Sequence, residues 1–162
     1  MVSLVHSRLD FENFILVGRP AYLQGQLQSV LNAAARLVFR LRRYDHITDA
    51  LAVLHWLRVP QHVDYKVAIM VFRALNGLST PYLAQLVRVA DQPGRHCLRS
   101  SSSHRQQVPV YRLATVGRRS FPVGAPILWN SLLLDIQLSA SLDFCYKLKT
   151  YLFQHSFPDI LL

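Results

Sequence analysis

The stretch LHWLRVPQHVDYK (54–66) brings a tryptophan, two histidines and an aspartate close together in the sequence. A histidine can transfer protons, but a catalytic histidine needs a partner within hydrogen-bond reach. The nearby carboxylates, Asp49 and Asp64, fall on two separate predicted helices. We therefore interpret the stretch as a corner between helices. His55 then lies near a helix C-terminus, Trp56 is a buried anchor, and Asp64 is solvated in the first turn of the next helix.

The best group of potential metal ligands lies in the stretch DQPGRHCLRSSSSHRQQ. It contains His96, Cys97 and His104, whose spacing matches no zinc motif, so a solvated loop is the simpler interpretation. The second cysteine, Cys145, falls on the apolar face of a predicted helix and is expected to pack in the core. The chain also has no glycine-rich phosphate loop and no adjacent pair of acidic residues. We expect no metal, no cofactor and no catalytic residue.

Positive charge is the strongest chemical signal in this sequence. The chain has 162 residues, a formal net charge of +9 and a pI of about 10.2, and most of its cations are arginines. Residues 67–119 carry eight of the cations and one anion, net +7. Arginine suits forked contacts to phosphate and stacking on bases. The charge therefore favours RNA or DNA as the partner over a membrane surface.

The spacing of the arginines predicts where such contact would occur. Arg36, Arg40 and Arg43 recur at i, i+4 and i+7, which predicts a basic stripe along one helix. Neither Arg36 nor Arg40 has an acidic partner four residues later, although a face charged only for solubility remains the alternative. Tyr44 and Tyr111 lie among the arginines and could stack on unpaired bases. The candidate nucleic-acid-binding residues are Arg36, Arg40, Arg43, Tyr44, Arg99, Arg105, Arg112, Arg118 and Arg119.

The spacing of apolar residues indicates the elements that must position these side chains. Helical periodicity predicts helices over 4–17, 23–41, 48–56, 60–76 and 81–87. Short links join them, so the fold class is mainly α, with a small bundle of four to five helices.

The second half of the chain has a different composition. Residues 90–107 are basic and serine-rich and predict a flexible loop. The segments 108–113 and 119–123 predict a short β-hairpin, because the prolines and glycine that follow argue against a helix. Ser141 is expected to cap a C-terminal helix. The predicted organisation is a helical bundle at 1–89, a basic loop at 90–107 and an extended segment plus helix packing on the bundle at 108–162.

No stretch of the sequence looks like a membrane or export signal. The longest apolar run, VAIMVF (67–72), is far shorter than the roughly 20 residues that span a bilayer. The first residues show no basic leader before an apolar core. Two cysteines are too few for a disulfide framework, which favours a reducing compartment. We expect a nuclear or cytoplasmic protein with no membrane partner.

Seven blocks in the sequence share their order with a known family. They are SRLDF (Ser7–Phe11), LQSVLNAAARLV (Leu27–Val38), RRYDHIT (Arg42–Thr48), LHWL (Leu54–Leu57), FRALNGLSTPYL (Phe72–Leu83), LRSS (Leu98–Ser101) and APILWNSL (Ala125–Leu132). Together they resemble the segment after the polymerase domain in reverse transcriptases of LINE-type (non-LTR) retrotransposons, in jockey-like and related vertebrate clades. The resemblance runs from about residue 5 to residue 153.

The resemblance implies a parent enzyme that nicks target DNA and copies its own RNA from the nick. The aspartates of the polymerase motif and the upstream endonuclease are not in this sequence. The matching segment is expected to hold template RNA and target DNA. Where the family usually has proline, this chain has Arg58 after LHWL and Leu133 after LWNSL.

Three functions follow from these observations. The first is a fragment derived from such a reverse transcriptase, without catalytic centres, that binds RNA or DNA non-specifically. The second is a helical protein-interaction module that docks on a polymerase domain or self-associates, since half of the residues are apolar. The third is an open reading frame with no selected function.

Overall fold

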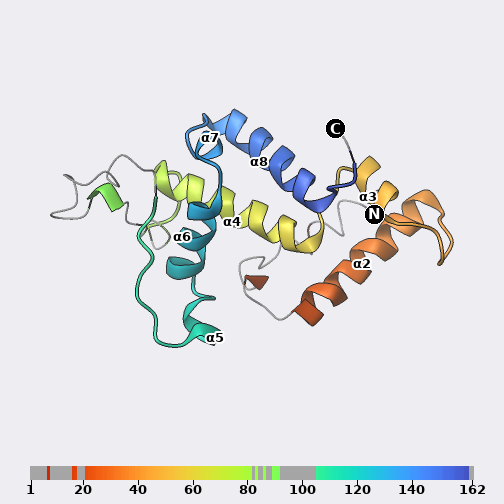
Figure 1. The fold of residues 1–162 in the computed structure, drawn as a ribbon, viewed down its shortest axis with the longest axis horizontal. Coiled ribbons are helices and arrows are strands. Elements are labelled where there is room, and N and C mark those ends of the chain that lie inside the picture. The colour runs from red at the N-terminus through yellow and green to blue at the C-terminus, as the bar shows by residue number, and fades with distance from the viewer. Residues whose placement is uncertain are drawn as a thin grey trace. The chain divides into compact units, whose positions relative to one another are not determined.

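The computed structural model describes residues 7, 16–17, 21–81, 83, 86, 89–91 and 105–160. Its regular structure is helical, which confirms the mainly α prediction (Figure 1). The longer helices are α2 (Ala21–Phe39), α4 (Val59–Leu75), α6 (Phe121–Ser131) and α8 (Ser141–Ser156). The shorter ones are α3 (Thr48–Val53), η2 (Val89–Asp91), α5 (Ala114–Gly117) and α7 (Leu134–Gln137). The predicted helices over 4–17 and 81–87 and the predicted loop over 90–107 lie largely outside the described residues.

The chain divides into two units. Unit 1 consists of Met1–Tyr65 together with Lys149–Leu162, and unit 2 consists of Lys66–Leu148. The division falls within α4 and α8, so each of these helices contributes one part to each unit. The predicted boundaries at 1–89, 90–107 and 108–162 stay predictions.

Unit 1 is built around the inner side of α2. The helix contacts α3 and buries Leu31, Ala34 and Ala35. Alanine has no side chain beyond Cβ, so a neighbouring helix can approach the backbone closely at these positions. The other buried apolar residues of the unit are Ala50, Leu51, Trp56, Leu57, Val59, Val63, Leu152, Phe153 and Phe157.

The predicted corner after α3 is confirmed. Trp56 is buried. Its backbone N–H donates to Leu51 O at 2.9 Å, and the backbone N–H of His55 donates to Ala52 O at 2.9 Å. This pair of bonds is a Schellman motif, and His55 occupies its left-handed position with a φ of +52°. The carbonyls at the end of α3 are thereby bonded, and the chain turns directly into α4.

A glutamine from α2 secures the start of α4. The first helical N–H of α4, from Val59, donates to Gln28 Oε1 at 2.8 Å. Gln28 Nε2 in turn donates to Asn32 Oδ1 at 2.9 Å, which orients the amide. The N–H groups of a first helical turn have no partner within the helix, so this long-range bond satisfies one of them.

The prediction of a β-hairpin over 108–113 and 119–123 is wrong. Residues 108–113 are described and form no strand, and the second segment enters α6 at Phe121. Pro122 lies in the first turn of α6, where a missing N–H costs nothing, and Pro126 removes a single later bond. Burial of Val123, Ala125 and Trp129 compensates for that loss. Tertiary packing therefore decides this helix against its local propensity.

The end of α6 packs against other parts of unit 2. We name this region the tryptophan block; it comprises Trp129, Asn130 and Leu132 with their partners Phe144 and Gln137. Trp129 and Phe144 are buried with ring centroids 5.8 Å apart. Gln137 Nε2 donates to Trp129 O at 2.8 Å and to Leu132 O at 3.0 Å, so a side-chain amide bonds the carbonyls that end the helix.

Asn130 joins α6 to the chain before α5. Its Nδ2 donates to Gln106 O at 2.9 Å, and its Oδ1 accepts from Gln106 N–H at 2.8 Å. One side-chain amide therefore satisfies both backbone groups of a buried residue. The tryptophan block explains the APILWNSL sequence as a packing element.

α8 begins at Ser141, one residue earlier than in the prediction, where Ser141 is the cap. The N–H of Phe144 donates to Ala140 O at 2.7 Å, which makes Ala140 the N-cap and Ser141 the first helical residue. Lys147 Nζ binds Asp135 Oδ2 at 2.9 Å and so links α8 to α7. Cys145, predicted as a core residue, is half-buried with a free thiol.

Candidate nucleic-acid interface

The prediction that Arg36, Arg40 and Arg43 form a stripe along one helix is wrong. α2 ends at Phe39, and Arg40 adopts a left-handed φ of +53°. The N–H of Leu41 donates to Arg36 O at 3.0 Å, which is the long bond of a Schellman motif. Only Arg36 lies on the helix. Arg40 ends it, and Arg43 belongs to the turn that follows.

The turn after α2 holds most of the exposed arginines in the described part of unit 1. Arg42 N–H donates to Asp45 Oδ2 at 2.6 Å, and Asp45 N–H donates to Arg42 O at 3.2 Å. These two bonds close a loop of four residues with Arg43 and Tyr44 at its tip. Arg40, Arg42 and Arg43 are all exposed, and Tyr44 is 90% exposed. We name Arg40, Arg42, Arg43 and Tyr44 the basic turn.

The arginines of the basic turn form no ion pairs within the described part of the chain, where no carboxylate lies within ion-pair distance of Arg40, Arg42 or Arg43. Asp45 is engaged by the backbone of the turn instead. The arginines also follow the C-terminal end of α2, where the helix dipole favours positive charge.

Arg36 differs from the basic turn in its surroundings. Its side chain is half-buried, and its Nε is buried with no hydrogen-bond partner among the residues described. A guanidinium that is partly withdrawn from solvent reaches an incoming phosphate less readily than an exposed one. Arg36 is thus the member of the predicted set in unit 1 that the structure separates from the others.

The remaining candidates belong to unit 2. Arg105, Arg112 and Arg118 are exposed, Arg119 is half-buried, and Arg99 lies outside the described residues. Arg105 and Arg112 precede α5 in the sequence, and Arg118 and Arg119 follow it directly.

Tyr111 is held by a close contact with α5. A Cβ placed on Gly117 would lie 2.7 Å from Tyr111 Cβ and 3.2 Å from the ring carbon Cδ2. Only glycine permits this approach. Tyr111 is 37% exposed against 90% for Tyr44. Of the two predicted stacking residues, Tyr44 has the open ring.

Sequence reasoning missed Arg42. Helical spacing places residue 42 away from a stripe through 36, 40 and 43, so the wrong helix boundary removed it from the set. The Arg42–Arg43 pair next to a tyrosine was the available signal. Consecutive residues in a turn can both face solvent, whereas consecutive residues on a helix point about 100° apart.

Asp64 is a described group whose acidity departs clearly from its ordinary value. The prediction that it is solvated is wrong. It is half-buried on α4, and burial raises the pKa of its carboxyl from 3.8 to about 6. No hydrogen bond or ion pair to it occurs among the described residues. An isolated carboxylate of this kind destabilises the fold when ionised.

Within the described ranges, no group of three or more histidine, cysteine or acidic residues could hold a metal. The predicted metal candidates His96, Cys97 and His104 lie outside those ranges. The described helices include none long and apolar enough to cross a membrane. The candidate residues are therefore the basic turn in unit 1 and, separately, the exposed arginines around α5 in unit 2.

The chain matches no protein-family model, no curated protein and no solved structure. The resemblance to LINE-type reverse transcriptases rests on the seven sequence blocks alone and stays a prediction.

Proposed function

We propose that this chain binds single-stranded RNA or DNA without marked sequence preference, and that the basic turn makes the main contact in unit 1. The observation that supports the proposal is the combination of three exposed arginines and a 90% exposed tyrosine in one closed turn. Arginines bind backbone phosphates in any sequence. An open tyrosine ring stacks on any base, because every base has a π face.

The geometry favours an unpaired strand over a duplex. A tyrosine at the tip of a short turn can stack only on a base that is not already stacked between neighbours in a helix. The turn also presents no helix or strand that could enter a major groove. Binding through phosphate and base faces is sequence-tolerant, so we expect affinities to vary little between strands of equal length.

We further propose that the chain derives from the segment after the polymerase domain of a LINE-type reverse transcriptase. The support is the ordered set of seven blocks, one of which, RRYDHIT, contains most of the basic turn. In this proposal the chain has no catalytic activity of its own, needs no cofactor, and meets nucleic acid in the nucleus or cytoplasm.

Fluorescence anisotropy with a labelled single-stranded RNA tests the basic turn. The double variant Arg42→Ala/Arg43→Ala should bind at least about ten-fold more weakly at low salt, because two phosphate contacts are lost. Tyr44→Ala should weaken binding by about five-fold or more, since a stacked base contributes roughly 1–3 kcal/mol.

Two matched variants serve as controls. Lys149→Ala removes an exposed cation from α8, and Tyr22→Ala removes a 66% exposed tyrosine from the start of α2. Both should bind as the unchanged chain does. Equal losses in the turn variants and the controls would contradict a role for the turn.

A second candidate function is a protein-interaction module. The observation in its favour is an apolar surface on and around α7 and at the start of α8 in unit 2, where large side chains are more than half exposed. They are Leu133, Leu134, Leu138, Leu142 and Tyr146. Analytical ultracentrifugation distinguishes the two functions: association that Leu142→Lys abolishes favours the module, and a monomer at every salt concentration counts against self-association.

A further inference from the structure

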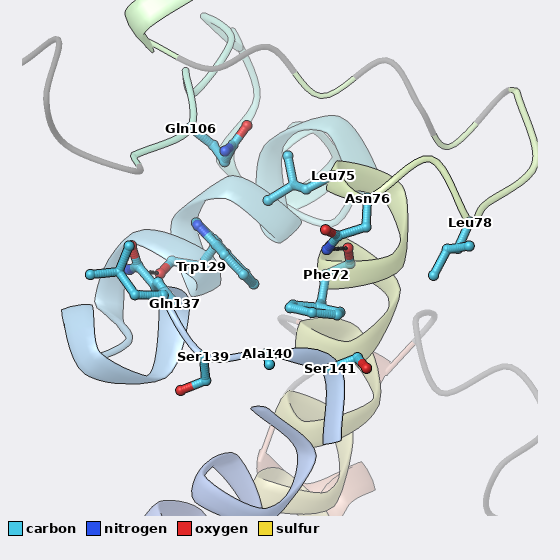
Figure 2. Close-up of a pocket in the computed structure, with 11 residues that line it drawn as sticks. Phe72, Leu75, Asn76, Leu78, Gln106, Trp129, Gln137, Ser139, Ala140 and Ser141 are labelled. Atoms are coloured by element: carbon cyan, nitrogen blue, oxygen red, sulfur yellow. Dashed lines mark hydrogen bonds between the residues drawn. The ribbon is translucent and has the colours of Figure 1, made fainter. Parts of the chain in front are cut away.

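Unit 2 contains a pocket that the binding surface described above does not use. Its volume is about 440 Å³, which lies within the range of small-molecule sites. Figure 2 shows Phe72 of α4 and Trp129 of α6 on facing sides of it, with the chain through Ser139, Ala140 and Ser141 along the bottom. All of the lining residues belong to unit 2.

Aromatic packing orients one wall. Phe144 stacks on Phe72 with ring centroids 4.3 Å apart and an angle of 18° between the planes. One face of the Phe72 ring is therefore covered by Phe144, and Phe72 also lines the pocket. The stack holds the ring in place, so a flat ligand can pack against it without reordering the side chain.

Neutral polar groups surround that aromatic wall. Asn76 Nδ2 donates to Phe72 O at 2.7 Å, which holds the amide in place and leaves its Oδ1 available. Gln137 uses Nε2 for the two carbonyls of α6 and keeps Oε1 as an acceptor. The Ser141 hydroxyl is exposed and makes no hydrogen bond within the described residues. Amides and hydroxyls of this kind match the donors and acceptors on the edge of a base.

Among the described residues that line the pocket there is no lysine, arginine, histidine or carboxylate. A charged ligand such as a free phosphate or a carboxylic acid would enter without a counter-charge, and burying it would be costly. A flat, uncharged heteroaromatic ring fits the lining, since it uses the aromatic face and the neutral polar groups together.

We infer that the pocket of unit 2 takes a single unstacked nucleobase. The inference rests on the proposed binding of single strands, for which it adds a base-binding site to the phosphate contacts. Only the base enters the pocket, and the phosphates of the strand stay in solvent. The few polar groups of the lining discriminate little between the hydrogen-bonding edges of different bases, so we expect the pocket to accept both purines and pyrimidines.

Saturation-transfer NMR on the full chain, with adenosine and uridine as probes, tests the inference. Both nucleosides lack phosphate, so the arginines of the basic turn do not hold them, and any stacking on Tyr44 would persist in the pocket variants and be lost in Tyr44→Ala. We expect saturable transfer with a dissociation constant of about 1 mM or below. Ala140→Leu fills the pocket from its rim and should weaken binding at least about ten-fold. The matched control Ala33→Leu adds the same group to an exposed position on α2 and should change nothing.

A second variant guards against misfolding at residue 140. Leu78 is 70% exposed and lines the pocket, so Leu78→Ala should leave the fold intact and weaken nucleoside binding about three-fold. No saturable transfer from either nucleoside, or equal transfer in Ala140→Leu and the unchanged chain, overturns the inference. RNA binding that persists in that case leaves the proposed function standing. Nucleoside binding without RNA binding refutes the proposed function alone.

Discussion

The basic turn and the tryptophan block are both short and both contain aromatic residues, yet they are built in opposite ways. The turn is exposed and charged, and backbone hydrogen bonds to Asp45 close it. The block is buried and neutral, and side-chain amides from Asn130 and Gln137 close it. Removing side chains from the turn leaves no cavity, whereas removing them from the block leaves a large one. The comparison therefore separates residues for binding from residues for folding.

Truncation of Trp129 in the block and of Tyr44 in the turn gives the largest expected contrast in the free energy of unfolding. Trp129→Ala should destabilise unit 2 by about 3–5 kcal/mol, because a buried indole and its contact with Phe144 are lost. Tyr44→Ala should change stability by less than about 0.5 kcal/mol, as expected for an exposed position. Urea unfolding followed by circular dichroism measures both. An unchanged midpoint for Trp129→Ala would contradict the burial of the block.

Asp64 offers a second test, because its ionisable carboxyl is largely buried in the folded chain. Its pKa is raised to about 6 in the folded chain, so the folded state binds more protons than the unfolded state between about pH 4 and 6. Stability should therefore fall as pH rises through this window and stay lower above it. Asp64→Asn should remove that fall and raise stability at pH 7 by about 2 kcal/mol.

Thermal unfolding of both proteins at pH 4, 5, 6 and 7 measures the effect. The matched control is Asp49→Asn, which changes an exposed carboxylate at the start of α3. The control should keep the pH dependence of the unchanged chain. A parallel pH profile for Asp64→Asn would show that burial of this carboxyl does not govern stability.

The helix ends give the smallest expected effect, and they compare a left-handed position in unit 1 with one in unit 2. Arg40 and Gly77 both occupy the left-handed position of a Schellman motif, with φ of +53° and +69°. A residue with a Cβ costs about 1 kcal/mol there. Arg40→Gly should stabilise the fold by about 0.5–1 kcal/mol, and Gly77→Ala should destabilise it by about the same amount.

Arg40→Gly should also weaken RNA binding, since it removes one exposed cation. Gly77→Ala should not. A gain in stability with a loss of binding would place Arg40 among residues kept for contact despite strain. Unchanged RNA binding by Arg40→Gly would show that Arg40 does not contact RNA.

Helical spacing was sufficient to predict α2, α4 and α8, because each places its apolar residues along one side. It failed at α6, where burial of Val123, Ala125 and Trp129 overrides two prolines and a glycine. Local propensity contains no information about the neighbours that supply this burial.

The candidate site was predicted in composition but not in geometry. The end of α2 could not be foreseen, because arginine rarely takes the left-handed position that glycine marks at residue 77. The wrong boundary produced a stripe through Arg36 and omitted Arg42. The burial of Asp64 and the pocket between Phe72 and Trp129 arise only from tertiary packing, so no spacing in the sequence indicates them.

A salt titration of binding to single-stranded RNA tests the central claim most directly. The logarithm of the binding constant should fall linearly with the logarithm of salt concentration, with a slope of about −0.7 for each phosphate contacted. The double variant Arg42→Ala/Arg43→Ala should have a shallower slope by about 1.4, and Lys149→Ala should keep the original slope. A flat dependence, no binding at low salt, or an equal slope in the double variant would contradict the account.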